Sequence, residues 1–308
     1  MIGRLLALTC TIILGLAAPA LGVTCSATVS NINFGSISVR SGATNQSTGT
    51  VQINCSNLLV SAVGVCLDFG AGSGGAASGL SPRYMLRSDG SQLAYDLSTS
   101  NGGAALSSVY VLVPLVLNTT LGSTSFTIYS NIVSNSVAVG TGTYSSTFSD
   151  PADVSMQYGV LSCGLLGTTG TVSNFTVSAN VVASCQVSSA ILGFGQVPSQ
   201  VTSPVDAQTT INVACTDQTP YSVLLGLGTG AGVTDPAHRK MASGANTLDY
   251  GLYQDAAHTT PWGNQSTNDV SAVGNGSTQS FSVYGQIHSG QTVPVGSYAD
   301  TVVVTVAY

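Results

Sequence analysis

Short runs of alternating apolar and polar residues recur along this chain and predict β-strands. At positions 175–181 the apolar side chains fall on every second residue, so they would share one face of a strand. The chain ends in a longer β-branched run at 298–308, which also favours a strand. Because Gly, Asn and Ser separate these runs, we expect many short strands joined by turns.

Composition strengthens the all-β prediction. Charged residues are only 6% of the 308 residues, every acidic residue is Asp, and Gly occurs 36 times. The chain is therefore poor in the residues that favour helices. Its 44% of hydrophobic residues can bury a core, and its net charge of −6 argues against nucleic-acid binding.

The first residues read as a targeting segment. Arg4 precedes an almost wholly apolar run at 5–18, Pro19 interrupts that run, and small residues lead to Gly22. This pattern is typical of a secretory signal cleaved after Gly22. A retained membrane anchor is the alternative, but the run is short for a span.

The rest of the chain contains an internal repeat of about 160 residues. Cys25 and Cys55 are 30 positions apart, as are Cys185 and Cys215, and Phe-Gly follows each first cysteine nine positions later. Further segments match in the same order: 83–85 with 239–241, 93–97 with 248–252, 126–129 with 281–284, and 139–144 with 295–298. We interpret the chain as two tandem immunoglobulin-like β-sandwiches of six or seven strands each.

The six cysteines after the signal predict disulfides, because an even count is typical of exported chains. The repeat pairs Cys25 with Cys55 and Cys185 with Cys215, which leaves Cys66 with Cys163. Their spacing does not fit a metal site, and we expect neither a metal nor a cofactor.

The two copies differ after their last matching tyrosine. Nineteen residues run from Tyr144 to Cys163 and include a strand near 154–160, whereas ten residues follow Tyr298. We therefore predict that the second sandwich lacks its last strand and exposes a groove that another chain must fill. The predicted groove edge comprises Val177, Val181, Val302, Val304, Val306 and Tyr308.

The copies also differ in the apolar content of their loops. The first copy has apolar runs at 58–63 and 109–117, where the second copy is polar. With the turn near 148–153, these would form three connections at one pole of the first sandwich, opposite the exit to the second. Strand ends buried in the core are the alternative. The predicted surface-binding residues are Leu58, Leu59, Val60, Val63, Val111, Leu112, Val113, Leu115, Val116, Phe148 and Pro151.

The expected domain limits follow from these patterns. They are a signal peptide at 1–22, an N-terminal domain at 23–163, a Gly/Thr/Ser-rich linker at 164–174 and a C-terminal domain at 175–308. No catalytic pattern stands out, so we do not expect an enzyme. We interpret His238, His258 and His288 as scattered surface histidines, and Asp150 and Asp153 as turn residues.

At this level the sequence resembles the spore coat protein U-like domain family. The resemblance rests on the Cys-flanked repeats with Phe-Gly, the Leu-x-Tyr-x-Leu segments and the runs at 252–263 and 295–308, and it is most specific over 175–308. It implies a subunit of an archaic, Csu-type chaperone–usher pilus. A two-domain member is similar to the tip subunit, with an N-terminal adhesin domain and a C-terminal pilin domain.

The resemblance also implies a mechanism and partners. A periplasmic chaperone would first fill the groove, an outer-membrane usher would export the chain to the cell surface, and an adjacent pilin would donate a strand. Only Val23 and Thr24 would precede Cys25, so we expect this chain to receive a strand but to donate none. Hydrophobic tip loops would attach to abiotic or host surfaces and promote biofilm formation. A spore or cyst coat protein, or a secreted carbohydrate-binding module or hydrolase, are the alternatives.

Overall fold

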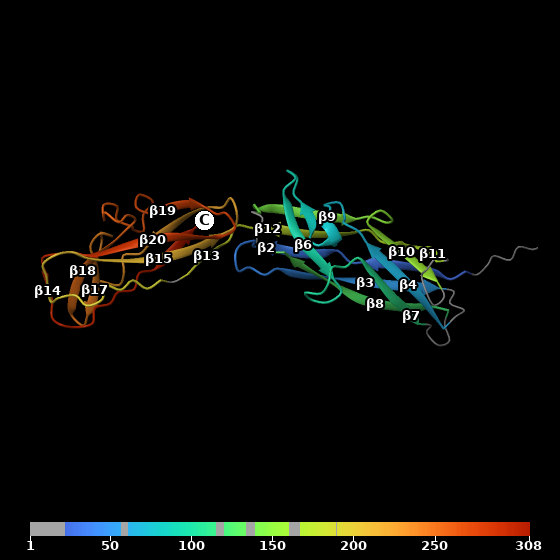
Figure 1. The fold of residues 1–308 in the computed structure, drawn as a ribbon, viewed down its shortest axis with the longest axis horizontal. Coiled ribbons are helices and arrows are strands. Elements are labelled where there is room, and N and C mark those ends of the chain that lie inside the picture. Colours follow the sequence, from blue (N-terminus) through green and yellow to red (C-terminus); the bar gives the residue numbers. More distant parts are fainter. Residues whose placement is uncertain (1–21, 57–60, 115–119, 134–138, 160–166, 189) are drawn as a thin grey trace, which may run out of the picture.

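The computed structural model describes residues 22–56, 61–114, 120–133, 139–159, 167–188 and 190–308 (Figure 1). In these ranges the chain forms β-strands and turns, with one short 3-10 helix at Ser78–Leu80. No helix found there combines the length and apolar character needed to cross a bilayer. The all-β prediction is confirmed, and the strands form two sandwiches one after the other (Figure 1).

Twelve strands build the first sandwich, and they join in one continuous sheet that curls around a single core. They are β1 (Thr24–Val29), β2 (Ile32–Ile37), β3 (Gln46–Ser56), β4 (Ala62–Phe69), β5 (Arg83–Leu86), β6 (Gln92–Ser98), β7 (Ser108–Pro114), β8 (Gly122–Ile132), β9 (Gly142–Phe148), β10 (Val154–Gly159), β11 (Thr168–Val172) and β12 (Phe175–Val181).

Ten strands build the second sandwich around a separate core. They are β13 (Cys185–Val187), β14 (Gln200–Val201), β15 (Val205–Cys215), β16 (Pro220–Leu225), β17 (Arg239–Ser243), β18 (Asn246–Tyr253), β19 (Val270–Val273), β20 (Thr278–Ile287), β21 (Gln291–Thr292) and β22 (Val304–Ala307).

The repeat read from the sequence is a repeat of structure. The order β13-β15-β20-β18-β17 in the second sandwich matches β1-β3-β8-β6-β5 in the first, and β19-β16-β22 matches β7-β4-β10. Disulfides join Cys25 to Cys55 and Cys185 to Cys215, as predicted. Cys66 is also disulfide-bonded. Its predicted partner Cys163 lies outside the described residues, so that pairing stays a prediction.

A buried arginine occupies the same position in each sandwich. The Arg83 guanidinium donates to the carbonyl oxygens of Phe69, Gly70, Leu80 and Leu106. The Arg239 guanidinium donates to the carbonyl oxygens of Leu225, Gly226, Pro236 and Trp262, the equivalent residues of the second copy. Both side chains are fully buried, so each one satisfies backbone groups that would otherwise be buried without partners.

A tyrosine makes the same backbone contact in both copies. The Tyr144 hydroxyl donates to the Gly140 carbonyl, and the Tyr298 hydroxyl donates to the Pro294 carbonyl, each over 2.9 Å. A tyrosine that bonds a few residues upstream at the start of a late strand is typical of immunoglobulin-like sandwiches.

The copies differ at the strand that closes the sandwich. In the first, β11 pairs antiparallel with β10 and parallel with β1, and β12 pairs antiparallel with β9 and parallel with β2. The β11–β12 segment therefore joins the two sheets into one. In the second, β13 and β22 are edge strands of separate sheets, and no described strand lies between them. A missing strand in the second sandwich is thus confirmed, but its identity differs from the prediction. The strand near 154–160 is β10, which has its counterpart in β22, and the absent strand is the counterpart of β11–β12.

These pairings correct the predicted domain limits. Residues 168–172 of the predicted linker form β11, and residues 175–181 form β12, whose apolar side chains are buried in the first core. The closing strand belongs to the first sandwich although its sequence follows the expected boundary. The connector is instead residues 182–184, between β12 and β13.

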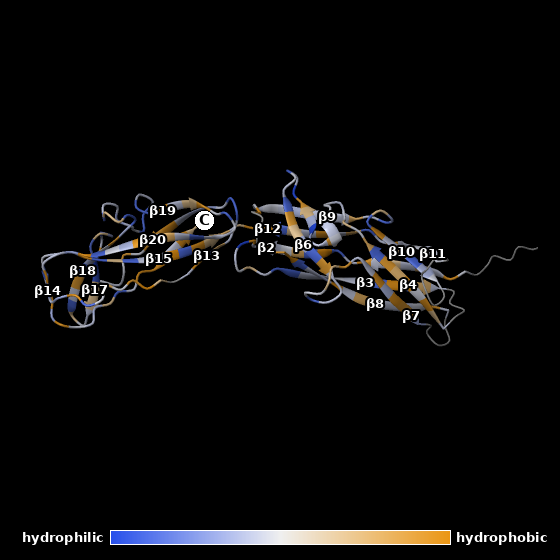
Figure 2. Cartoon of the chain, viewed as in Figure 1, coloured by the Kyte–Doolittle hydropathy of each residue, from blue (hydrophilic) through white to orange (hydrophobic). Residues whose placement is uncertain are grey.

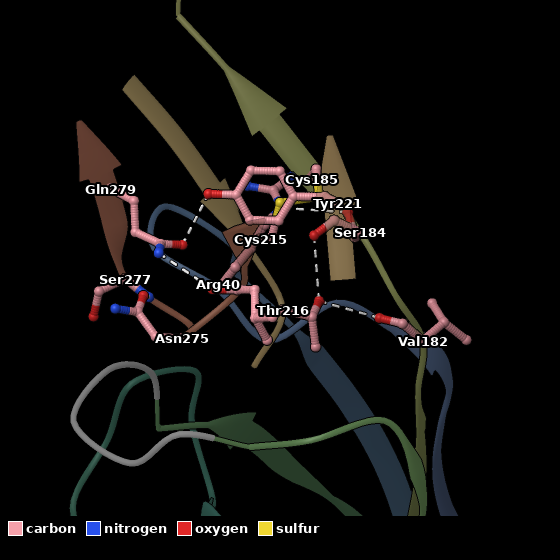
Figure 3. The surroundings of a disulfide bond; sticks show 11 residues. Arg40, Val182, Ser184, Cys185, Cys215, Thr216, Tyr221, Asn275, Ser277 and Gln279 are labelled. Atoms are coloured by element: carbon pink, nitrogen blue, oxygen red, sulfur yellow. Dashed lines mark hydrogen bonds between the residues drawn. A yellow bond between two sulfur atoms is a disulfide. The ribbon is translucent and has the colours of Figure 1, made fainter. Parts of the chain in front are cut away.

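Hydrogen bonds hold the two sandwiches at this short connector (Figure 3). Arg40 of the first donates to Ser184 Oγ over 3.3 Å and to Gln186 Oε1 over 2.6 Å. The Thr216 hydroxyl of the second donates to the Val182 carbonyl over 3.2 Å, beside the Cys185–Cys215 disulfide. The junction is therefore bonded on both sides of the connector.

Candidate functional site

Strand β22 forms one rim of an open groove in the second sandwich. Its inward-facing residues Val304 and Val306 remain half-buried, and Tyr308 beyond them is 62% exposed. The equivalent residues of β10 are Val154, Met156 and Tyr158, which are 1%, 0% and 6% exposed. Since the registers against β16 and β4 are equivalent, the absent neighbouring strand explains the difference.

The opposite rim of the groove is the segment 190–199. Leu192 is half-buried, whereas its equivalent Ile32 is 0% exposed in β2, which pairs with β12. Ile191 on this rim and Val295 near the other rim are 92% and 96% exposed. Between the rims lie two adjoining cavities of about 350 and 640 Å³ that share the side chains of Leu192, Phe194, Met241 and Tyr298. Most of the side chains that line these cavities are apolar.

A carboxylate lines the groove where the first sandwich has a serine. Asp300 Oδ1 accepts hydrogen bonds of 2.7 Å from the Thr229 amide and hydroxyl, and Oδ2 accepts one of 2.7 Å from the Tyr250 hydroxyl. In the first copy, Ser146 Oγ accepts from the Gly74 amide. Burial works to raise the pKa of Asp300, but these hydrogen bonds outweigh it and lower the pKa overall.

The same network affects Tyr250 and a nearby glycine. Burial, first, and then the hydrogen bond to Asp300 raise the pKa of the Tyr250 hydroxyl. Gly228 has a φ of 82°, and a Cβ there would lie 2.0 Å from Asp300 Oδ2. Glycine is therefore required on both conformational and steric grounds.

The structure divides the residues predicted for the groove edge. Val302 and Val304 line the groove, whereas Val306 and Tyr308 continue along β22 beyond the lining residues, so their part in the groove stays a prediction. Val177 and Val181 do not line the groove, because both are buried in the first core by the pairing of β12 with β2 and β9. Their assignment to the groove was wrong because the predicted domain boundary placed β12 in the second sandwich.

A second candidate region is the pole of the first sandwich farthest from the second. Strand registers bring the end of β3 beside the starts of β1 and β8, the start of β4 beside the end of β7, and the end of β10 beside the start of β11. Gly64 of β4 pairs with Gly159 of β10 on one side and with Leu112 of β7 on the other. These strand ends meet at the right-hand end of Figure 1. The connections that leave from them fall mostly outside the described residues.

Edge strand β7 presents apolar side chains to solvent near this pole. Tyr110 and Leu112 are 51% and 53% exposed, and Pro114 follows them on the same face. Val113 faces the core between them and is fully buried. Figure 2 shows hydrophobic residues gathered along β4 and β7. Pro114 is compatible with this position because β7 is an edge strand of the sheet, where a residue without a backbone N–H is tolerated.

The predicted surface-binding residues fall into three groups. Leu112 and Pro151 are exposed, and Val111 is half-buried. Val63, Val113 and Phe148 are at most 1% exposed, so their assignment as exposed residues is wrong. Residues outside the described ranges are Leu58, Leu59, Val60, Leu115 and Val116, for which exposure stays a prediction.

The predicted position of the turn at 149–153, at the pole of the first sandwich, is wrong. Val154 pairs with Phe69, at the end of β4 opposite to the pole, so this turn lies midway along the sandwich. Its Asp150 and Asp153 carboxylates accept backbone hydrogen bonds from Val172 and Ser149, as expected of turn residues. The end of β10 at Gly159 and the start of β11 at Thr168 instead lie near the pole.

Sequence reasoning missed Tyr110 and Leu121, which are 51% and 57% exposed. It also passed over the sequence Val-Leu-Ser-Cys-Gly-Leu-Leu at 160–166, which is as apolar as those at 58–60 and 115–117 and lies outside the described residues. The assignment of 164–174 to a linker obscured this apolar content.

Comparison with known proteins agrees with this architecture. The Spore Coat Protein U domain model matches residues 12–149 and 171–305. Protein U of Myxococcus xanthus is 33% identical over 150 residues, covering 44% of this chain and 84% of Protein U.

Two solved structures resemble the chain over most of its length. The CsuC–CsuE chaperone–tip adhesion subunit pre-assembly complex from archaic chaperone-usher Csu pili of Acinetobacter baumannii matches with a TM-score of 0.52 and 16% identity, covering 93% of this chain and 100% of that chain. The CupB6 tip adhesin from Pseudomonas aeruginosa matches with a TM-score of 0.31 and 11% identity, covering 92% and 94%. At 16% identity, the match to the CsuC–CsuE complex shows a similarity of fold.

Proposed function

The chain belongs to the Spore Coat Protein U domain family, and from this premise we propose that it is the tip subunit of a chaperone–usher pilus. Its second sandwich accepts a strand from the adjacent pilin, and its first sandwich contacts the surface to which the cell adheres. The role is one of structure and binding, without catalysis.

One observation carries the proposal: β11–β12 completes the first sandwich, and the equivalent place in the second is an open apolar groove. A strand that enters the groove antiparallel to β22 would find unpaired backbone groups on one side and half-buried valines beneath it. Among the described residues the first sandwich offers no such place, so the acceptor site is assigned to the second sandwich.

The proposed partners follow from the groove. Before assembly a periplasmic chaperone occupies it, and the fold match is to a tip subunit crystallised with its chaperone. An outer-membrane usher then exchanges the chaperone for the donor strand of the neighbouring pilin. This sequence takes the chain through the periplasm to the cell surface, with the signal peptide predicted at 1–22 removed on the way.

A chain extended with its own closing strand tests the acceptor role. Residues 159–181 appended after Tyr308 reproduce the connection that closes the first sandwich, because Tyr308 is equivalent to Tyr158. We expect the second sandwich to unfold at a higher urea concentration in the extended chain. Trp262 is the only tryptophan and is buried in the second core, so its fluorescence reports that sandwich alone.

The matched control carries Phe175→Asp and Val177→Asp in the appended copy only. It should unfold as the unextended chain does, since charged residues cannot fill the groove. If extension and control have the same midpoint, or if neither differs from the original chain, the groove is not an acceptor for a strand.

For adhesion, the described residue to test is Leu112, exposed on edge strand β7. Piliated cells carrying Leu112→Asp should bind less to a hydrophobic surface such as polystyrene. Val133, 39% exposed and beyond the opposite end of β8, supplies the control Val133→Asp. Equal adhesion by the two variants would remove β7 from the binding surface.

A further inference from the structure

Two of the three histidines converge on one carboxylate at the end of the second sandwich farthest from the first. His238 precedes β17, Asp249 lies in β18 and His288 follows β20. Asp249 Oδ1 lies 3.0 Å from His238 Nδ1 and 2.5 Å from His288 Nδ1. The expectation of scattered surface histidines is therefore wrong for this pair, which the sheet brings together across 50 positions of sequence.

Neighbouring side chains hold two of the three groups in place. The Gln291 side chain accepts from the Asp249 amide over 2.7 Å and donates to the carbonyls of Asp249 and His288, each over 2.8 Å. This clamp ties β18 to the turn after β20. His238 is less constrained, since its side chain is 60% exposed and it lies outside the strands.

Tyr253 can accept the Nε2 proton of His288 when Nδ1 binds a metal ion. Its hydroxyl lies 3.1 Å from His288 Nε2. When His288 Nε2 carries the proton and donates it to this hydroxyl, Nδ1 is left with a free lone pair that points toward Asp249. Histidines that bind metals commonly donate their other ring N–H to such a partner.

The three ligand atoms are close to the spacing that a small cation requires. All of them lie within 4.8 Å of one another. Ligands at tetrahedral Zn²⁺ are separated by about 3.3 Å, so the histidine–carboxylate distances need to open by less than an ångström. The exposed side chain of His238 can supply that adjustment.

The chemistry of the donor set selects the kind of ion. Two imidazole nitrogens and one carboxylate oxygen suit Zn²⁺, Cu²⁺ or Ni²⁺, whereas Ca²⁺ and Mg²⁺ prefer oxygen ligands alone. Two neighbouring cations are engaged elsewhere: Lys240, which pairs with Asp249 across the hairpin, donates to the Ala231 carbonyl, and Arg239 donates to backbone carbonyls. Three protein ligands leave a fourth position for water.

We propose that His238, Asp249 and His288 form a binding site for a divalent transition-metal ion, with Zn²⁺ as the reference ion. The bound ion links the segment before β17, strand β18 and the turn after β20. It therefore fastens the β17–β18 hairpin to the rest of the sheet, in the sandwich that lacks its closing strand.

Zinc titration of the full chain without a histidine tag tests the site. We expect one Zn²⁺ per chain by calorimetry, visible absorption from Co²⁺ bound in its place, and no competition from Ca²⁺. His238→Ala should weaken Zn²⁺ binding at least about tenfold, since loss even of groups that only support a ligand costs this much. The exposure of His238 makes this variant unlike a core substitution, so its fold should persist.

The remaining histidine provides the matched control. His258 lies near Gln286 and Asp206 and contacts the Tyr253 ring, but it supplies no atom to the three-ligand cluster, so His258→Ala should bind Zn²⁺ nearly as the unmodified chain does. Trp262 fluorescence verifies that all variants are folded. Failure of the unmodified chain to bind Zn²⁺, or equal affinities for the His238 and His258 variants, would overturn the proposal.

Discussion

The two sandwiches share strand order, disulfide position and buried arginine, yet only the first has its sheets joined. The difference lies in the β11–β12 segment, which supplies a strand between β10 and β1 and between β9 and β2. Val154 is buried beneath it, whereas the equivalent Val304 is half-buried. The comparison teaches that one missing strand can convert a core position into a binding surface without changing the strands that remain.

The features that both sandwiches share are those that folding requires whether or not the closing strand is present. Arg83 and Arg239 satisfy the same four carbonyls in the closed and the open sandwich. The sandwich thus needs its arginine whether or not the closing strand is present.

The largest effect is expected from truncation of these arginines. Arg83→Ala and Arg239→Ala should each reduce the stability of their own sandwich by about 3 kcal/mol or more, because four buried carbonyls lose their donor. Urea unfolding followed by Trp262 fluorescence should respond to Arg239→Ala and not to Arg83→Ala. Lysine at either position should not restore stability, since its ammonium cannot reach all four carbonyls. Equal response to both variants would show that the two sandwiches unfold together.

A smaller loss of stability is expected when equivalent valines of the closed core and the open groove are truncated to alanine. Val154→Ala should cost the first sandwich about 2 kcal/mol, as methyl groups are lost from a fully buried site. Val304→Ala should cost the second about 1 kcal/mol or less, because water already reaches that side chain. Thermal unfolding measures both.

The strand extension provides the decisive control for this pair of valines. In the chain extended by residues 159–181, the cost of Val304→Ala should rise toward that of Val154→Ala. An unchanged cost would mean that the appended strand does not cover β22.

The smallest effect concerns pH. The folded-state pKa of Asp300 is lowered, so its hydrogen bonds stabilise the second sandwich above the unfolded pKa of 3.8, and that contribution is lost as pH falls through the folded value. Because the group is partly exposed, we expect less than about 1 kcal/mol. Asp300→Ser, which copies Ser146, should remove this part of the acid sensitivity in Trp262 fluorescence between about pH 5 and pH 2. An identical acid profile in the variant would assign the sensitivity to other carboxylates.

Several features were predictable because they depend on local pattern or on repetition. The strands follow from alternation, and two of the disulfides and the arginine pair follow from matching segments of the two copies. Comparison of the copies within one sequence also identified which of them ends early.

The closing strand was not recognised because its sequence resembles a linker. Gly170 lies in β11, where a Cβ would be 2.1 Å from Met156 Cε and 2.9 Å from the Cys25 carbonyl oxygen. Close packing therefore requires this glycine, but in the sequence it reads as a turn or a flexible connection. The error moved β12 into the wrong sandwich and placed Val177 and Val181 at the groove.

The sequence alone determined the all-β class, the paired cysteines and the unequal ends of the two copies. These features follow from alternation, composition and duplication, which can be read along the chain. Contacts between distant segments were decided by tertiary structure alone. They are the parallel pairing of β11 and β12 with β1 and β2, the burial of Val63, Val113 and Phe148, and the meeting of His238 and His288 at Asp249. The physical reason is that strand partners and their register depend on burial across the whole sheet, which no local stretch of sequence specifies.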